Sequence, residues 1–188
     1  MMNETRDFPS YLEGLIHGIP SLIYVGAAIL LCIGLLIFIK WKGFRKGIRF
    51  ASLLALVEYV ALIYCSTVLF RVTRGIHKYD FHPFWSNNDP TLFVENVMNV
   101  VVFVPVGLLM GIAFKDIRWW QVLLIGCGIS VSIETLQFVF MKGFSELDDV
   151  MHNTLGCMIG YGVYALARYG YERISKRSVG VLKTRKFE

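Results

Sequence analysis

Polar side chains interrupt several otherwise apolar stretches of this sequence, and these are the side chains that could do chemistry. Glu134 and Gln137 lie three residues apart inside one apolar stretch, and Asn96 and Asn99 lie three apart at the start of another. Residues three apart in an α-helix share one face, so each pair would present its polar groups to the same side. Carboxylates and amides offer the acceptors and donors that sugar, peptide or ammonium groups need.

Further polar residues stand at the ends of neighbouring apolar stretches. Arg71 follows one stretch, and a guanidinium can bind a carboxylate or phosphate through two parallel hydrogen bonds. The acidic pair Asp148 and Asp149 opens the last stretch. Together these residues predict a binding site, without assigning a catalytic role to any of them, and its members are Arg71, Asn96, Asn99, Glu134, Gln137, Asp148, Asp149 and Asn153.

Several of these features also have a purely structural interpretation. Ser145 and Asp148 fit the S-x-x-D capping box of a helix start, and Asn96 is of a residue type that caps helices. The G-x-x-x-G pattern at 156–160 is typical of close helix packing in membranes. Glu134 is harder to explain in this way, because it lies about two helical turns, or ~10 Å, inside an apolar stretch and needs a partner there.

The elements that must position these residues are long apolar helices. Of the 188 residues, 55% are hydrophobic and 18% are charged, whereas soluble domains average about 45–50% apolar and about a quarter charged. A helix needs about 20 apolar residues to cross a bilayer. We therefore expect an all-α membrane helix bundle with about five transmembrane helices, at residues 21–39, 50–70, 96–114, 119–141 and 149–169.

The distribution of lysine and arginine predicts the orientation of the bundle, because basic segments stay in the cytoplasm. With the N-terminus outside, 14 of the 19 basic residues fall in cytoplasmic segments and five in outer segments. The C-terminus is then cytoplasmic, and the candidate site lies toward the outer leaflet as an outward-facing polar pocket. The predicted organisation is an N-terminal part with two helices at 1–70, a three-helix core at 71–169 and a basic cytoplasmic tail at 170–188.

Other classes of site find little support in the sequence. The net charge of +5 has no nucleic-acid-binding motif beside it, so we expect no nucleic-acid partner. The four cysteines lie in apolar stretches without a C-x-x-C spacing, which favours neither disulfides nor zinc. His77, His82 and His152 could join the acidic pair around a metal, but no metal-ligand spacing frames them. We expect neither a metal nor a cofactor.

Three segments, in order, resemble the signature of the VanZ-like family. They are Asn96-x-x-Asn99-x-x-x-Phe103-x-Pro105-x-Gly107, Ile133-Glu134-x-x-Gln137, and Asp148-Asp149-Val150-x-x-Asn153-Thr154-x-Gly156-x-x-x-Gly160-Tyr161. The pair Pro83-Phe84 after Arg71 is similar to a short element of the same family, so the resemblance covers roughly half of the chain. Members often carry an arginine before the acidic pair, where this sequence has Lys142 and Gly143.

The resemblance implies a multi-pass protein of the bacterial cell membrane. The founding member of the family is associated with low-level resistance to the glycopeptide antibiotic teicoplanin. On this basis the favoured function is binding of an envelope lipid, a cell-wall precursor or a glycopeptide. Expected partners are the lipid bilayer, such a precursor, an anionic lipid or a glycopeptide, and a second copy of the chain.

Two other functions stay open at this point. A membrane enzyme acting on a lipid-linked envelope substrate would use Glu134 as a general acid or base. A small transporter or flippase would place its site near the middle of the bilayer, between repeated and interrupted helices, and the sequence contains no internal repeat.

Overall fold

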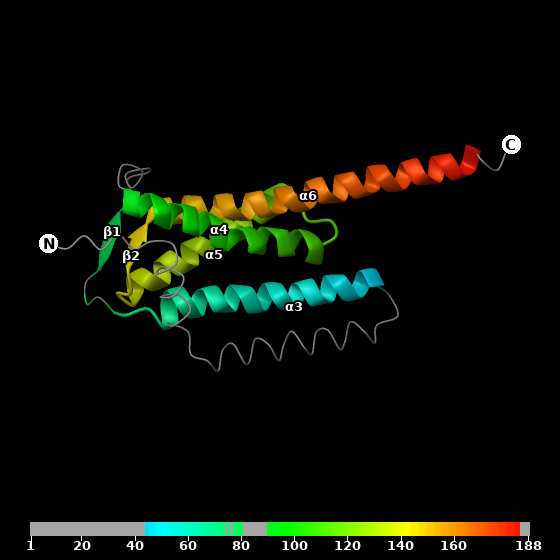
Figure 1. Cartoon of the computed structure of the whole chain (residues 1–188). Helices are drawn as coiled ribbons and strands as arrows, with labels where there is room; N and C mark the ends of the chain where they lie inside the picture. The colour runs from blue at the N-terminus through cyan, green and yellow to red at the C-terminus, as the bar shows by residue number, and fades with distance from the viewer. Residues whose placement is uncertain (1–43, 74, 76, 81–89, 185–188) are drawn as a thin grey trace.

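A computed structural model describes residues 44–73, 75, 77–80 and 90–184 (Figure 1). The predicted first span at 21–39, His82 and the Pro83-Phe84 pair lie outside the described residues. The elements in chain order are α3 (Phe44–Tyr64), the π-helix η1 (Cys65–Leu69), β1 (Lys78–Asp80), α4 (Pro90–Ala113), α5 (Trp119–Val139), β2 (Phe144–Glu146) and α6 (Leu147–Thr184).

Three of these helical segments are long and apolar enough to cross a membrane. They are Lys46–Leu69, Phe93–Ala113 and Trp119–Val139, and they correspond to the second, third and fourth predicted spans. The predicted fifth span lies within α6, which is not among the three segments that meet this criterion. The total of five spans and the orientation of the termini stay predictions.

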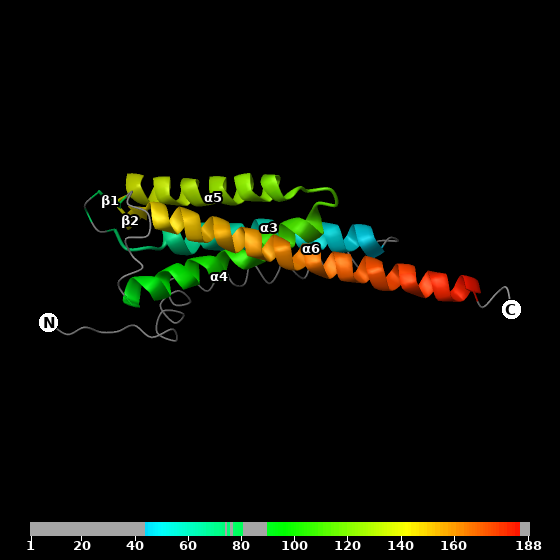
Figure 2. The same ribbon diagram turned by 90° about the horizontal axis from the view of Figure 1, so that it is seen from above.

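The four long helices lie side by side with alternating chain direction (Figures 1 and 2). As a result, one end of the bundle gathers the end of α3, the start of α4, the end of α5 and the start of α6. We call this the polar end, because the predicted polar residues lie on these parts of the helices. At the other end α6 extends well beyond its neighbours (Figure 1), and its helix includes most of the segment predicted as a basic tail.

A small parallel sheet closes the polar end. Strand β1 pairs with β2 so that Lys78 is opposite Phe144, Tyr79 opposite Ser145 and Asp80 opposite Glu146. Both strands lie between predicted spans, where no regular element was expected, so this sheet corrects the expectation of an all-α bundle. Three-residue strands are too short to show the alternating polar and apolar pattern by which strands are recognised.

Helices α4 and α6 pack backbone against backbone through glycines. A Cβ atom added at Gly107 would lie 1.8 Å from the carbonyl oxygen of Cys157. One at Gly160 would lie 1.9 Å from the carbonyl oxygen of Val104, and one at Gly156 2.2 Å from that of Val100. No side chain fits at such distances, so the close helix packing predicted from the G-x-x-x-G pattern is confirmed.

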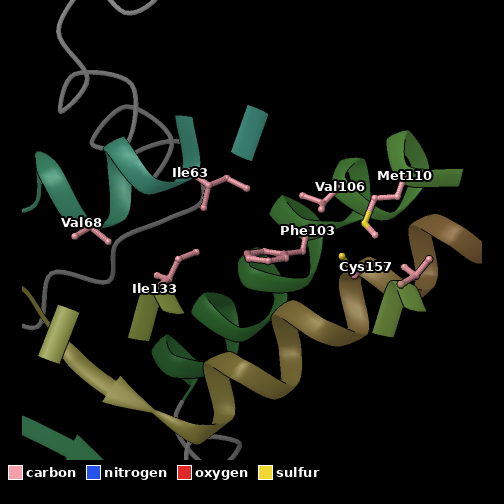
Figure 3. Close-up of a cluster of buried hydrophobic side chains, with 8 residues drawn as sticks. Ile63, Val68, Phe103, Val106, Met110, Ile133 and Cys157 are labelled. Carbon is pink, nitrogen blue, oxygen red and sulfur yellow. The ribbon is translucent and has the colours of Figure 1, made fainter. Parts of the chain in front are cut away.

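An apolar core lies between the helices below the polar end (Figure 3). Phe103 and Val106 on α4 meet Cys157 on α6 and Ile133 on α5, and all four are buried. Large apolar side chains such as Leu124 on α5 are instead exposed on the outer surface of the bundle. This distribution suits a lipid environment, where outward-facing apolar side chains meet hydrocarbon.

Replacing Gly160 with alanine tests the importance of the α4–α6 contact. The new methyl group would force the two backbones apart, and we expect the free energy of unfolding to fall by about 1–3 kcal/mol, the usual range for overpacking. Thermal or denaturant unfolding of the purified protein in detergent micelles would measure this loss.

Gly162→Ala is the matched control, because an added Cβ at this position of the same helix meets nothing within 4 Å. The higher helix propensity of alanine should leave its stability unchanged or raise it by up to about 1 kcal/mol. Equal stability of the two variants would contradict the glycine-dependent packing.

Candidate functional site

Glu134 is a buried carboxylate near the polar end of α5. Its side chain is 5% exposed, and its Oε2 accepts a hydrogen bond of 3.1 Å from the backbone N–H of Glu146. That donor is the last residue of β2, so the sheet brings a backbone N–H to the carboxylate. Asp149 and Arg71 lie close enough to act on Glu134 electrostatically, the first by repulsion and the second by attraction.

Asp149 joins α6 to α4 through a side-chain hydrogen bond. Asn99 Nδ2 donates to Asp149 Oδ1 at 2.7 Å, and the positive charge of Arg71 also attracts this carboxylate. The two helices approach closely enough for this bond because glycines line their contact. Asn99 and Asp149 are therefore neighbours in space, although 50 positions separate them in sequence.

Arg71 and Gln137 meet at Gly143, in the loop after α5. A Cβ atom added at Gly143 would lie 3.0 Å from an Arg71 guanidinium nitrogen and 3.4 Å from Gln137 Oε1. Gln137 Nε2 donates to the backbone carbonyl of Thr67, in the π-helix, at 3.2 Å. Its Oε1 is buried and has no hydrogen-bond partner among the described residues. Arg71 is itself exposed.

Lys142 stands where the family resemblance leads one to expect an arginine. Its Nζ donates to the backbone carbonyl of Leu69 at 2.8 Å. Leu69 is the last residue of η1, where the helix leaves carbonyl groups without intrahelical donors. The ammonium group of Lys142 therefore stabilises the end of this helix.

The remaining predicted site residues lie deeper at the same end of the bundle. Asn153 is 4% exposed and donates from Nδ2 to Ser130 Oγ on α5 at 2.8 Å, while its buried Oδ1 has no partner within the described part of the chain. Asn96 and Asp148 are 3% and 0% exposed. All eight predicted residues thus gather at the polar end, five of them buried.

Two structural alternatives considered from the sequence do not fit the helix boundaries. Helix α4 begins at Pro90, so Asn96 lies in its second turn and does not cap it. Proline is common at the first position of a helix, where its missing N–H costs nothing. Helix α6 begins at Leu147, and Ser145 lies within β2, so Ser145 is not the residue that immediately precedes this helix.

Acidic side chains outnumber basic ones around the strand β2. Burial, and after it the negative charges of Asp149, Glu95, Asp148 and Asp80, together raise the pKa of Glu146 to about 7. These carboxylates come from α6, α4 and β1. Any proton or cation that reaches Glu146 is therefore bound more strongly than by an isolated carboxylate.

A cavity of about 390 Å³ opens beside Glu134 and Glu146. Apolar side chains form most of its wall, and the two glutamates add carboxylate oxygens. The residues that line it come from β1, α5, β2 and α6, and they are Tyr79, Val131, Glu134, Thr135, Phe138, Ser145, Glu146, Leu147 and Val150. An apolar wall with a few polar groups is the usual make-up of a small-molecule site.

Sequence reasoning found Glu134 but missed the other polar groups of this cavity. Glu146 and Ser145 follow no helical stripe, because they belong to a strand that was expected to be a loop. Tyr79 reaches the cavity through the pairing of β1 with β2. The one signal in the sequence was Glu146, an acidic residue two positions before the Asp148-Asp149 pair.

The predicted absence of a metal stays a prediction. Within residues 44–73, 75, 77–80 and 90–184, no group of three or more histidine, cysteine, aspartate or glutamate side chains is arranged to hold a metal ion. His77 Nδ1 lies 2.8 Å from the carbonyl oxygen of Phe138, and His152 Nδ1 lies 2.7 Å from that of Asp148. Both rings are thus engaged with the backbone.

The apolar helices and the buried polar groups at one end define a helical membrane protein. The model of the VanZ/LLP1 family matches residues 22–168, which is most of the chain. The protein therefore belongs to the VanZ/LLP1 family, as its motifs predicted.

A relative of known name supports this assignment. Protein VanZ of Enterococcus faecium is 35% identical over 75 residues, which make up 40% of this chain and 47% of that protein. The chain thus matches about half the length of this relative. No solved structure matches the chain.

The raised pKa of Glu146 predicts a pH-dependent stability. Because its pKa is higher in the folded state than the ordinary value of 4.5, the folded protein binds this proton more tightly than the unfolded chain does. The stabilisation from this group is complete below about pH 4.5 and is lost as the pH rises through about 7. Unfolding in micelles between pH 5 and 8 should show this decline for the wild type.

Glu146→Gln should flatten that part of the profile, since the amide stays neutral throughout. Glu172→Gln is the control, because Glu172 is exposed and pairs with Arg168 on the far part of α6. An identical decline in Glu146→Gln and the wild type would show that another group titrates.

Proposed function

We propose that this protein is a multi-pass protein of the bacterial cell membrane that binds an amphiphile at its polar end. The bound molecule would be an envelope lipid, a cell-wall precursor or a glycopeptide, and binding would contribute to resistance of the teicoplanin type. Membership of the VanZ/LLP1 family and the relative named Protein VanZ support this direction. The site faces the outer side in this proposal, as the distribution of basic residues predicts.

The single observation that carries the proposal is the composition of the cavity wall. Val131, Phe138 and Val150 offer contact to a hydrocarbon chain, and Glu134 and Glu146 offer charge to a polar head. A volume of about 390 Å³ falls within the common range for ligand sites, about 300–1,000 Å³. An amphiphile satisfies both parts of such a wall, whereas a wholly polar or wholly apolar ligand satisfies one.

Enzymatic action on a lipid-linked substrate is the second candidate, and one observation favours it. Glu134 is buried, lines the cavity and lies within electrostatic reach of Asp149 and Arg71. A carboxylate in such surroundings can act as a general acid or base. Conversion of an envelope lipid by the purified protein, with loss of product in Glu134→Gln, would favour this candidate over binding alone.

Blocking the cavity with a large side chain tests the binding function. Thr135 lines the cavity and is exposed, so Thr135→Trp should fill it and weaken binding of teicoplanin or a lipid-linked precursor by at least about tenfold, which corresponds to about 1.4 kcal/mol. Binding is measured by native mass spectrometry or fluorescence on protein in nanodiscs.

Val139→Trp is the matched control for this experiment. Val139 lies one turn further along α5 and is 55% exposed, but it does not line the cavity. Both variants add an indole to the same face of one helix. Equal binding in Thr135→Trp and Val139→Trp would exclude the cavity as the site.

Resistance in cells tests the biological part of the proposal. Arg71→Gln, Glu134→Gln and Asp149→Asn should each abolish protection against teicoplanin, because each removes a charge from the polar end. The minimum inhibitory concentration is compared at equal protein level in the membrane, judged by immunoblotting. Glu58→Gln is the control, since Glu58 lies on α3 and does not line the cavity. Wild-type protection by all three site variants would overturn the proposal.

A further inference from the structure

We infer that the cavity at the polar end recognises a primary ammonium group at the head of an amphiphile, with Glu134 and Glu146 as its carboxylate partners. This inference names the ligand chemistry of the site and rests on the proposed binding function. It is carried by a largely buried carboxylate in the cavity wall, the charges around the cavity and the acceptors in its wall.

Glu134 is one of the two carboxylates in the wall of the cavity. This side chain is 95% buried and lines the cavity. Its Oε2 accepts the N–H of Glu146. A largely buried carboxylate has few water molecules to stabilise its charge, so a donor on a ligand in the cavity would stabilise it. The cavity beside it has room for that donor.

The ionisable side chains among the described lining residues of the cavity are acidic. Two carboxylates line the cavity, and no lysine, arginine or histidine is among its described lining residues. Of the nearby cations, Lys142 donates to the carbonyl of Leu69, and Arg71 attracts Glu134 without lining the cavity. An anionic head group would oppose the ionisation of these two carboxylates, whereas a cationic one would favour their ionised form.

The acceptors in the cavity wall indicate which kind of cation would bind. An alkylammonium group carries three N–H donors and no acceptor. The wall of the cavity offers it carboxylate oxygens from Glu134 and Glu146 and the hydroxyl oxygen of Ser145. The cavity suits a metal ion less well than an ammonium group, because the described residues contain no group of three side chains arranged to ligate a metal. The apolar side chains of Val131 and Val150 continue the wall for the attached hydrocarbon.

The test uses amphiphiles with one tail and different heads. Dodecylamine, dodecanol, dodecyltrimethylammonium and dodecyl phosphate are titrated into the full-length protein in nanodiscs. Dodecylamine should bind at least about tenfold more tightly than dodecanol, because a charge-assisted hydrogen bond is about twice as strong as a neutral one. It should also exceed the trimethylammonium compound, which has charge but no N–H donor.

Variants separate the two carboxylates from the rest of the wall. Glu134→Gln should remove most of the difference between dodecylamine and dodecanol, while Glu58→Gln should retain it. Thr135→Trp should weaken both compounds, because it blocks the cavity for the shared tail. A circular-dichroism and unfolding check on each variant keeps misfolding apart from loss of binding.

The pH dependence supplies an independent readout. Asp80 from β1, Glu95 from α4, Glu134 from α5, and Asp148 and Asp149 from α6 surround Glu146, and Arg71 acts on Glu134 and Asp149. The pKa of Glu146 is about 7, while alkylamines stay protonated below about pH 10. Affinity for dodecylamine should therefore rise between pH 6 and 8, and this rise should be smaller in Glu146→Gln.

The outcomes distinguish this inference from the proposed function. Equal binding of dodecylamine and dodecanol, both lost in Thr135→Trp, would overturn the ammonium inference and leave the amphiphile site standing. Preference for dodecyl phosphate would overturn it in favour of an anion. Binding that no cavity variant affects would remove the proposed function together with the inference.

Discussion

The structure depends on the close approach of α4 and α6 through their glycines. Carbonyl oxygens of one helix occupy the space that a side chain would need on the other, at Gly107, Gly156 and Gly160. Lipid provides no hydrophobic force between helices, so such contacts associate them through van der Waals packing. The same approach brings Asn99 within 2.7 Å of Asp149. Without it, Asp149 on α6 would lose its amide partner Asn99 on α4.

The polar end shows how backbone and side chains satisfy one another where helices end. The sheet formed by β1 and β2 pairs two loop segments and directs the N–H of Glu146 to Glu134. Gln137 and Lys142 donate to carbonyl groups in η1. Most polar groups here have a structural partner. Among the described residues of this end, Gln137 Oε1 and Asn153 Oδ1 are the buried side-chain atoms left without a partner.

Membership of the VanZ/LLP1 family gives the protein a relation to Protein VanZ but no reaction. The cavity adds a chemical feature to that relation, because its wall combines apolar side chains with the carboxylates of Glu134 and Glu146. Its lining includes the exposed apolar side chain of Val131 on α5.

The sequence by itself determined the membrane class, the positions of three apolar spans and the gathering of polar residues at one end. Apolar length and helical spacing are local properties, so they can be read along the chain. The G-x-x-x-G pattern likewise predicted the close packing that α6 makes with α4. Only the tertiary structure decided that Ser145 and Glu146 belong to a strand paired with residues 78–80. That pairing joins segments more than 60 positions apart, and such contacts depend on how whole helices pack. For the same reason the sequence placed Glu134 in a polar region, but the cavity beside it emerged only from the fold.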